Sequence, residues 1–195
     1  MRFPHLLRRF GRDAEPTEER NLRERGAAAL EFALIAPFFF LVVFGGIEIG
    51  LMFRSHLALE DMSRSAARVA SIERDAADAD RVILSRIESK AAPLNGDITR
   101  VVIFSAPTLD AQVPVACTTA NASLAGQCNI YEITNGNLST LTAAGSTLET
   151  GLTAAERDQW QNLGIYIEYD YQYVTGFFDS ITLSTTSVEV VELDL

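Results

Sequence analysis

Few residues of this chain are suited to catalysis. The two histidines, His5 and His56, lie near the N-terminus and beside an apolar segment, whereas a triad or a metal centre needs a histidine inside the folded domain. Glu168 and Asp170 could serve acid–base chemistry, but on an alternating strand they share one solvated face. The sequence contains no P-loop, G-x-G-x-x-G, G-x-S-x-G or C-x-x-C motif. We therefore expect no enzymatic activity, no cofactor and no bound metal.

Two other carboxylates are notable because they interrupt an apolar block. Residues 27–53 are almost free of charge, with Glu31 and Glu48 as the exceptions. A helix rises 1.5 Å per residue, so these two glutamates would lie about 26 Å apart along it. That distance places them near opposite edges of a hydrocarbon core about 30 Å thick. The block is therefore expected to form one transmembrane helix.

The arginines before this block set its orientation. The first 26 residues hold seven arginines and five acidic residues, and positive flanks stay in the cytoplasm. A cleaved secretory signal is the rival interpretation, but its apolar region is shorter and ends in a small-x-small site. Here EIGLMFRSHL follows instead. We expect a basic cytoplasmic leader at 1–26 and an exported C-terminus. The arginines are Arg2, Arg8, Arg9, Arg12, Arg20, Arg23 and Arg25.

The remainder of the chain is acidic. It contains nine basic and 21 acidic residues, whereas a nucleic-acid-binding protein needs a basic face to neutralise phosphates. The sequence thus argues against DNA, RNA or anionic lipid headgroups as partners of the exported part.

The boundary between leader and apolar block, RERGAAALEFALIAPFFF, resembles the processing site of type IV prepilins. This resemblance implies cleavage between Gly26 and Ala27 by a prepilin peptidase. It also makes Glu31 the fifth residue of the mature chain, where it would pair with the α-amino group of a neighbouring subunit. From the residues alone, Glu31 fits equally well at the headgroup level, where a carboxylate stays solvated.

Glu48 lies in GGIEIG, where Gly46 and Gly50 form a G-x-x-x-G pattern. Such a pattern lets membrane helices approach closely, which would give Glu48 a role in assembly. The alternative is an interfacial glutamate beside two incidental glycines.

The longer segment RGAAALEFALIAPFFFLVVFGGIEIG and the closing pattern ITLSTTSVEVVEL resemble the TadE-like proteins of the Flp/Tad (tight adherence) pilus system, a type IVb pilus. The resemblance covers residues 26 to about 75 and 164–195. It implies a minor pseudopilin of the bacterial inner membrane, with prepilin peptidase, other pilins and the pilus assembly platform as partners. The alternative is an unprocessed, single-pass periplasmic accessory or binding module.

Beyond the membrane, residues 54–95 predict a helical stem. Apolar residues recur at three- and four-residue steps at Leu59, Met62, Ala66, Val69 and Ala70, and again at Val82, Ile83, Ile87 and Ala91. A break is expected near 75–80. The aspartates there, Asp75, Asp78 and Asp80, are interpreted as a solvated helix face.

Residues 96–195 predict an α+β exported domain with a small antiparallel sheet. Strands are expected at 97–106, 113–117, 165–175 and 181–193, and a helix at 153–163. Pro114 would confine the second strand to an edge. The cysteines Cys117 and Cys128 lie in a turn-rich stretch and form either a disulfide, if exported, or two small buried thiols.

Overall fold

The protein is described from a computed structural model of its 195 residues. The structure describes residues 17–73, 78–92, 94–120, 122–133, 162–176 and 179–190, with the backbone alone at 17–23. Contacts divide the chain into two compact units, 1–46 and 47–195.

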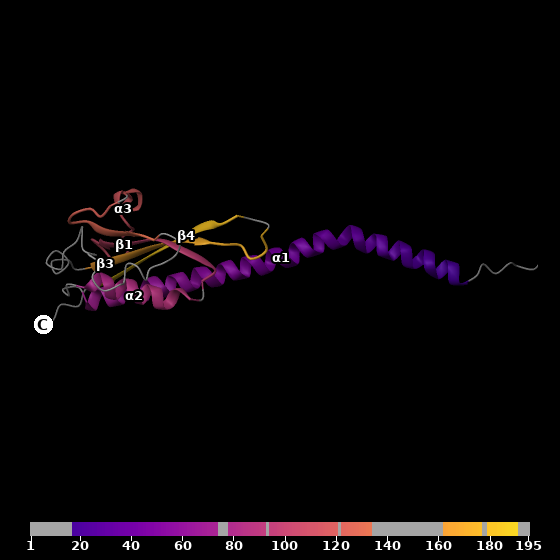
Figure 1. The fold of residues 1–195 in the computed structure, drawn as a ribbon, viewed down its shortest axis with the longest axis horizontal. Helices are drawn as coiled ribbons and strands as arrows, with labels where there is room; N and C mark the ends of the chain where they lie inside the picture. The colour runs from indigo at the N-terminus through magenta and orange to yellow at the C-terminus, as the bar shows by residue number, and fades with distance from the viewer. Residues whose placement is uncertain are drawn as a thin grey trace, which may run out of the picture. The chain divides into compact units, whose positions relative to one another are not determined.

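The described elements form an α+β arrangement, in which two helices come first in the chain and most of the strands follow (Figure 1). In chain order they are α1 (Thr17–Ile72), α2 (Ala79–Ala91), β1 (Gly96–Ser105), α3 (Val115–Thr119), β2 (Cys128–Glu132), β3 (Asn162–Tyr171) and β4 (Ile181–Val190). The predicted fold class, a long N-terminal helix followed by a small antiparallel sheet, is confirmed.

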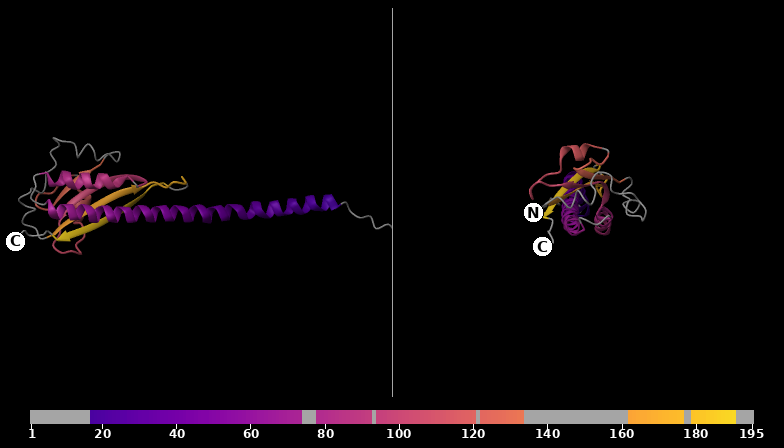
Figure 2. Two further views of the ribbon diagram at one scale, coloured as in Figure 1. Left: turned by 90° about the horizontal axis from the view of Figure 1, so that it is seen from below. Right: turned by 90° about the vertical axis from the view of Figure 1, so that its left-hand side faces the viewer.

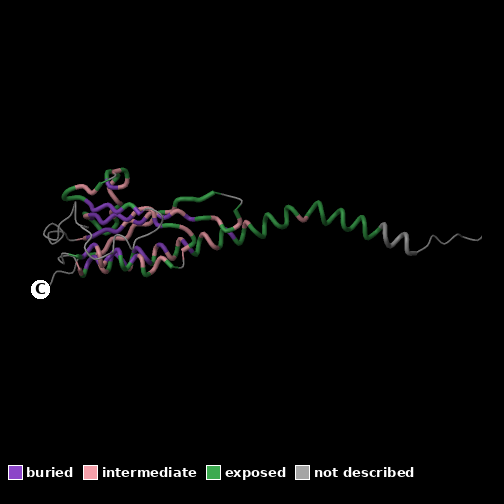
Figure 3. The backbone as a smooth tube through the Cα atoms, in the orientation of Figure 1, coloured by how far each residue is buried: buried purple, intermediate pink, exposed green. Residues whose placement is uncertain are grey.

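The N-terminal part of α1 presents apolar side chains to its surroundings. From residue 24 to 46 nearly all of its residues are exposed (Figure 3), and Phe38 and Leu41 are among the large ones. Among the described helices, α1 from Glu24 to Ile72 is long and apolar enough to cross a membrane. The hydrocarbon core of a bilayer would cover these apolar side chains, which the described part of the chain leaves exposed.

The four described strands form one antiparallel sheet in the order β2-β1-β3-β4. The side chains of β3 alternate between the two faces of the sheet. The odd-numbered ones from Leu163 to Tyr171 are buried on the inner face, and the even-numbered polar ones are half-buried. The predicted pairing of the two C-terminal strands is confirmed, with Ile167 opposite Thr185.

Helices α1 and α2 lie side by side under one face of this sheet (Figure 2). Their apolar faces and the inner face of the sheet form the main core, which includes Leu59, Met62, Ala66, Ile83, Ile87, Val101, Ile103, Ile165, Ile167 and Tyr169. Ser63 of α1 also donates a hydrogen bond to the Ile165 carbonyl, 3.3 Å away. At the surface, Lys90 of α2 pairs with Asp61 of α1 and lowers the pKa of that carboxyl.

The structure has a helix on each side of the predicted break. Of the three aspartates predicted on a solvated face, Asp78 is exposed and Asp75 lies outside the described residues. α1 ends at Ile72 and α2 begins at Ala79, so the break lies where it was expected. Asp80, however, is fully buried rather than solvated. Its carboxylate accepts hydrogen bonds from the Asn129 side chain and the Tyr131 hydroxyl of β2, because the first turn of α2 faces that strand.

The predicted strand at 113–117 is wrong, because Val115–Thr119 forms the short helix α3. Pro114 has no N–H for a ladder but can start a helix, and its carbonyl accepts from Cys117 N and Thr118 N. α3 lies on the other side of the sheet from α1 and α2 (Figure 1).

The start and end of β3 and the presence of β2 also differ from the sequence prediction. The predicted helix at 153–163 is wrong at its end, because Asn162 and Leu163 belong to β3; residues 153–161 lie outside the described part. β3 stops at Tyr171 rather than 175. β2 was not predicted, since CNIYE follows a turn-rich stretch and is only five residues long.

Gly164 provides a direct test of the outer face of the sheet. A Cβ added there would lie 2.2 Å from Cζ of Phe104, which is fully buried in the adjacent strand. We expect Gly164→Ala to destabilise the domain by about 1–3 kcal/mol through overpacking. Chemical denaturation of the detergent-solubilised chain measures this.

The matched control is Phe104→Leu, which removes the ring that the new methyl group meets. In the Phe104→Leu background the added cost of Gly164→Ala should shrink, giving a favourable coupling in a double-mutant cycle. Equal costs in both backgrounds would show that the ring does not set the constraint.

Candidate functional site

The residue with the most developed surroundings is Glu48. It is 3% exposed although it lies on an apolar helix. One carboxylate oxygen, Oε1, accepts from Val174 N at 2.8 Å and from the Tyr171 hydroxyl at 3.2 Å; the other, Oε2, accepts from Thr175 N at 3.1 Å. Three donors from one short segment thus surround one charge.

These donors come from the last residue of β3, Tyr171, and from the link between β3 and β4, which meets α1 (Figure 1). Asn95 holds the link from another side: its carbonyl accepts from Gln172 N at 3.0 Å, and its side-chain amide donates to the Gln172 carbonyl. The link is therefore fixed to α1 through Glu48 and to the turn before β1 through Asn95.

Two tyrosines support this arrangement. The rings of Tyr171 and Tyr173 meet edge to face, 5.4 Å between centroids. Burial, and secondarily the neighbouring Glu48 carboxylate, raises the pKa of the Tyr171 hydroxyl. It therefore remains protonated and able to donate. Burial raises the pKa of Tyr169 to about 12.

The geometry around Glu48 holds the sheet domain in position on α1. Hydrogen bonds to a carboxylate are stronger and more directional than neutral ones, so Glu48 fixes the sheet domain against the helix that carries it. Within the described ranges, no group of three or more His, Cys, Asp or Glu side chains is placed to hold a metal ion.

The other predicted assembly and processing residues are exposed. Glu31 lies on the exposed stretch of α1, and Gly26 and Ala27 lie about one turn earlier. α1 already begins at Thr17, so the Gly26–Ala27 peptide is helical. Nothing lies within 4 Å of a Cβ built at Gly26, so close packing does not explain this glycine.

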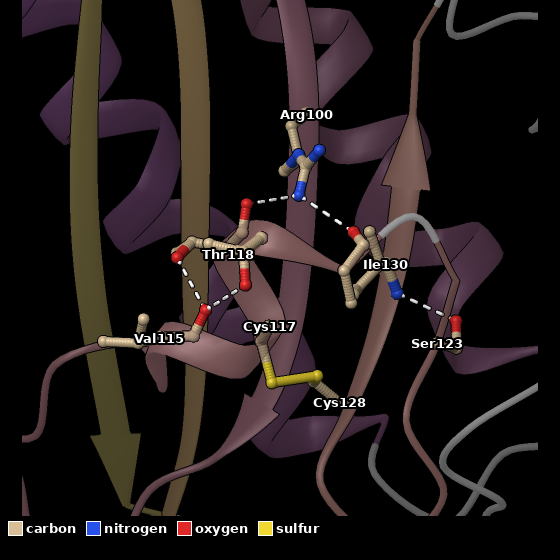
Figure 4. Close-up of a disulfide and its surroundings, with 9 residues drawn as sticks. Arg100, Val115, Cys117, Thr118, Ser123, Cys128 and Ile130 are labelled. Atoms are coloured by element: carbon tan, nitrogen blue, oxygen red, sulfur yellow. Dashed lines mark hydrogen bonds between the residues drawn. A yellow bond between two sulfur atoms is a disulfide. The ribbon is translucent and has the colours of Figure 1, made fainter.

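On the outer face of the sheet, Cys117 of α3 and Cys128 of β2 are joined by a disulfide (Figure 4). Both are fully buried in a second apolar cluster with Val102, Phe104 and Ile130. The disulfide fastens the α3 segment over the part of the sheet formed by β1 and β2.

Arg100 of β1 reinforces the same segment. Its guanidinium donates to the carbonyls of Thr118 at 2.6 Å and Ala120 at 3.1 Å (Figure 4). It also pairs with Glu132 of β2 at 2.8 Å. These contacts of Arg100, called the Arg100 clamp below, were not predicted, because the sequence around a single arginine in a strand does not indicate which loop it will bind. The donors to Glu48 were not predicted either, and two of them are the backbone amides of Val174 and Thr175.

We expect Glu48→Gln to loosen the β3–β4 link. A glutamine is neutral and offers one acceptor oxygen where the carboxylate offers two, so all three donors lose a charged partner and at least one of them loses its acceptor. Hydrogen exchange of the Val174 and Thr175 amides should accelerate by about tenfold or more, the scale of one lost charge-assisted bond.

Glu31→Gln is the matched control, because it makes the same chemical change on the same helix, whereas the amides of Val174 and Thr175 donate to Glu48. It should leave exchange at 174 and 175 unchanged. Unaltered exchange in Glu48→Gln would mean that the link is held without the carboxylate.

We expect the Cys117→Ser, Cys128→Ser double variant to lose about 2–4 kcal/mol of unfolding free energy, since the disulfide restricts the unfolded chain. Reductant should lower the melting temperature of the native chain and leave that of the double variant unchanged. A native chain insensitive to reductant would contradict this expectation.

The comparisons with known proteins agree with the N-terminal pattern. Residues 26–68 match the family model described as TadE-like protein. No curated protein and no solved structure matches this chain. The match starts at Gly26 and covers the exposed part of α1, Glu48 and the first residues of the main core. The recognition from sequence is therefore confirmed: this chain carries the TadE-like segment.

Proposed function

We propose that this chain is a minor pseudopilin needed to assemble a Flp/Tad-type pilus. The TadE-like segment associates it with Tad pilus systems. We place the chain in the bacterial inner membrane, with leader 1–26 in the cytoplasm and the sheet domain in the periplasm. The match to residues 26–68 is the observation that carries this proposal, and the disulfide is compatible with an oxidising compartment.

Processing after Gly26 is the first step of the proposal. Gly26 is the first residue of the family match and lies inside a helix, where glycine costs about 0.5–1 kcal/mol relative to alanine. The helix is thus weakened at the bond that a prepilin peptidase would have to unwind and cut. Cleavage would give Ala27 a free α-amino group.

Glu31 and Glu48 take different parts in assembly. Glu31 is exposed on an apolar stretch of α1, so a partner for it in the membrane must come from outside the chain; we propose the α-amino group of a neighbouring subunit. Glu48 already has three donors within the chain. Its part is to position the exported domain.

The test is the N-terminal sequence and intact mass of the membrane-extracted chain, expressed with and without a prepilin peptidase. We expect a new N-terminus at Ala27 that depends on the peptidase. Gly26→Ala is the matched variant, because it keeps a small residue but removes the backbone freedom of glycine, and it should remain uncut.

An intact Met1 start in both expressions would favour the alternative, an unprocessed single-pass periplasmic accessory module. A second readout separates the two functions. Glu31→Ala should abolish piliation of a pilus-forming host if the carboxylate sets the assembly register, and it should have no effect on an accessory module that stays outside the filament.

A further inference from the structure

We propose that the β3–β4 link, residues 172–176, rests in the headgroup region of the periplasmic leaflet, so that the partner of this surface is the lipid bilayer itself. This rests on one part of the proposed function, that α1 crosses the membrane, and not on processing or pilus assembly.

The first step concerns the level of the link along α1. Val174 N and Thr175 N both donate to Glu48, so the link lies beside the turn of α1 that carries Glu48. Residues from 48 onward pack on the sheet, since Leu51 and Met52 touch the main core. The lipid-exposed span then runs from 27 to 47, about 30 Å at 1.5 Å per residue, which is the thickness of the hydrocarbon core.

The second step follows from that level. The polar regions of a bilayer add roughly 5–7 Å on each side of the hydrocarbon. Glu48 is the first residue after the span, so the backbone amides bound to it lie at the inner boundary of this layer. The link cannot avoid the headgroup region while those hydrogen bonds hold.

The side chains of the link suit this environment. Val174 is 61% exposed, the link QYVTG carries no charge, and Tyr173 belongs to the residue type enriched at membrane interfaces. On α1 next to Glu48, Ile49 is 55% exposed. Water alone would leave these apolar surfaces uncovered.

Most of the backbone amides of the link already have hydrogen-bond acceptors within the protein. The headgroup region still contains water, and only backbone that reaches the hydrocarbon must satisfy all its N–H groups within the protein. Three amides of this link are hydrogen-bonded: Gln172 N to the Asn95 carbonyl, and the amides of Val174 and Thr175 to Glu48. The buried Glu48 carboxylate thereby lowers the desolvation cost of the link.

Tryptophan depth measurements test this inference. In a Trp160→Phe background, the variants Val174→Trp, Leu41→Trp and Val115→Trp are reconstituted in phosphatidylcholine vesicles with lipids brominated either near the headgroup or deep in the acyl chain. These lipids are zwitterionic, so the acidity of the domain does not decide the result. Leu41 is 72% exposed on the span and Val115 is 77% exposed at the start of α3.

We expect the fluorescence of Val174→Trp to be quenched several-fold more by shallow than by deep bromines, that of Leu41→Trp by deep ones, and that of Val115→Trp by neither. Quenching in Leu41→Trp without quenching in Val174→Trp would overturn the inference and leave the membrane anchor intact. An unquenched Leu41→Trp variant would overturn the anchor. Blue-shifted, unquenched emission from Val174→Trp that depends on protein concentration would assign the surface to a second copy, which also overturns the inference.

A second measurement leaves Val174 in place. In nanodiscs, magnetisation transfer from lipid protons should reach the Val174 and Thr175 amides of the native chain. Glu48→Gln, which frees the link, should weaken that transfer. No transfer in the native chain would contradict lipid contact whatever the tryptophan variant does.

Discussion

The hydrogen bonds to the Glu48 carboxylate are the interaction on which much of the fold depends. Glu48 follows the exposed apolar stretch of α1, where an ionised carboxylate is costly without hydrogen-bond donors. Its side chain is buried and accepts from two backbone amides and one tyrosine hydroxyl. Leaving such a charge without donors in an apolar setting costs more than most single contacts contribute. The β3–β4 link is therefore held where α1 leaves its exposed apolar stretch, and the register of β3 against the main core follows.

The sheet is secured differently on its two faces. Toward α1 and α2 it is packed by ordinary apolar burial. Toward α3 the cover is a short helix that buries little by itself, so a disulfide and the Arg100 clamp supplement it.

The sequence predicted what periodicity and charge control. The apolar helix, the helix break near 75–80 and the alternation of β3 can each be predicted from runs or periodicities of several residues, and each is present in the structure. The errors have two causes. Asp80 was placed in solvent although it faces β2, 49 residues away, and no local pattern encodes such a contact, because it depends on packing that follows from the complete fold. Pro114 was assigned to a strand edge although it starts α3, because proline suits both positions and its own neighbours in sequence do not decide between them.

The two glutamates of the apolar block illustrate the same limit. Glu31 and Glu48 have equivalent surroundings in sequence, each an acid among apolar residues. What distinguishes them is whether another part of the chain supplies donors: Tyr171, Val174 and Thr175 do so for Glu48, and Glu31 is exposed in its helix. A charge satisfied within the chain fixes intramolecular geometry. Glu31, which is exposed on the apolar stretch of α1, is the glutamate that our proposal assigns to assembly, because a second subunit can supply the partner that a carboxylate needs in a membrane.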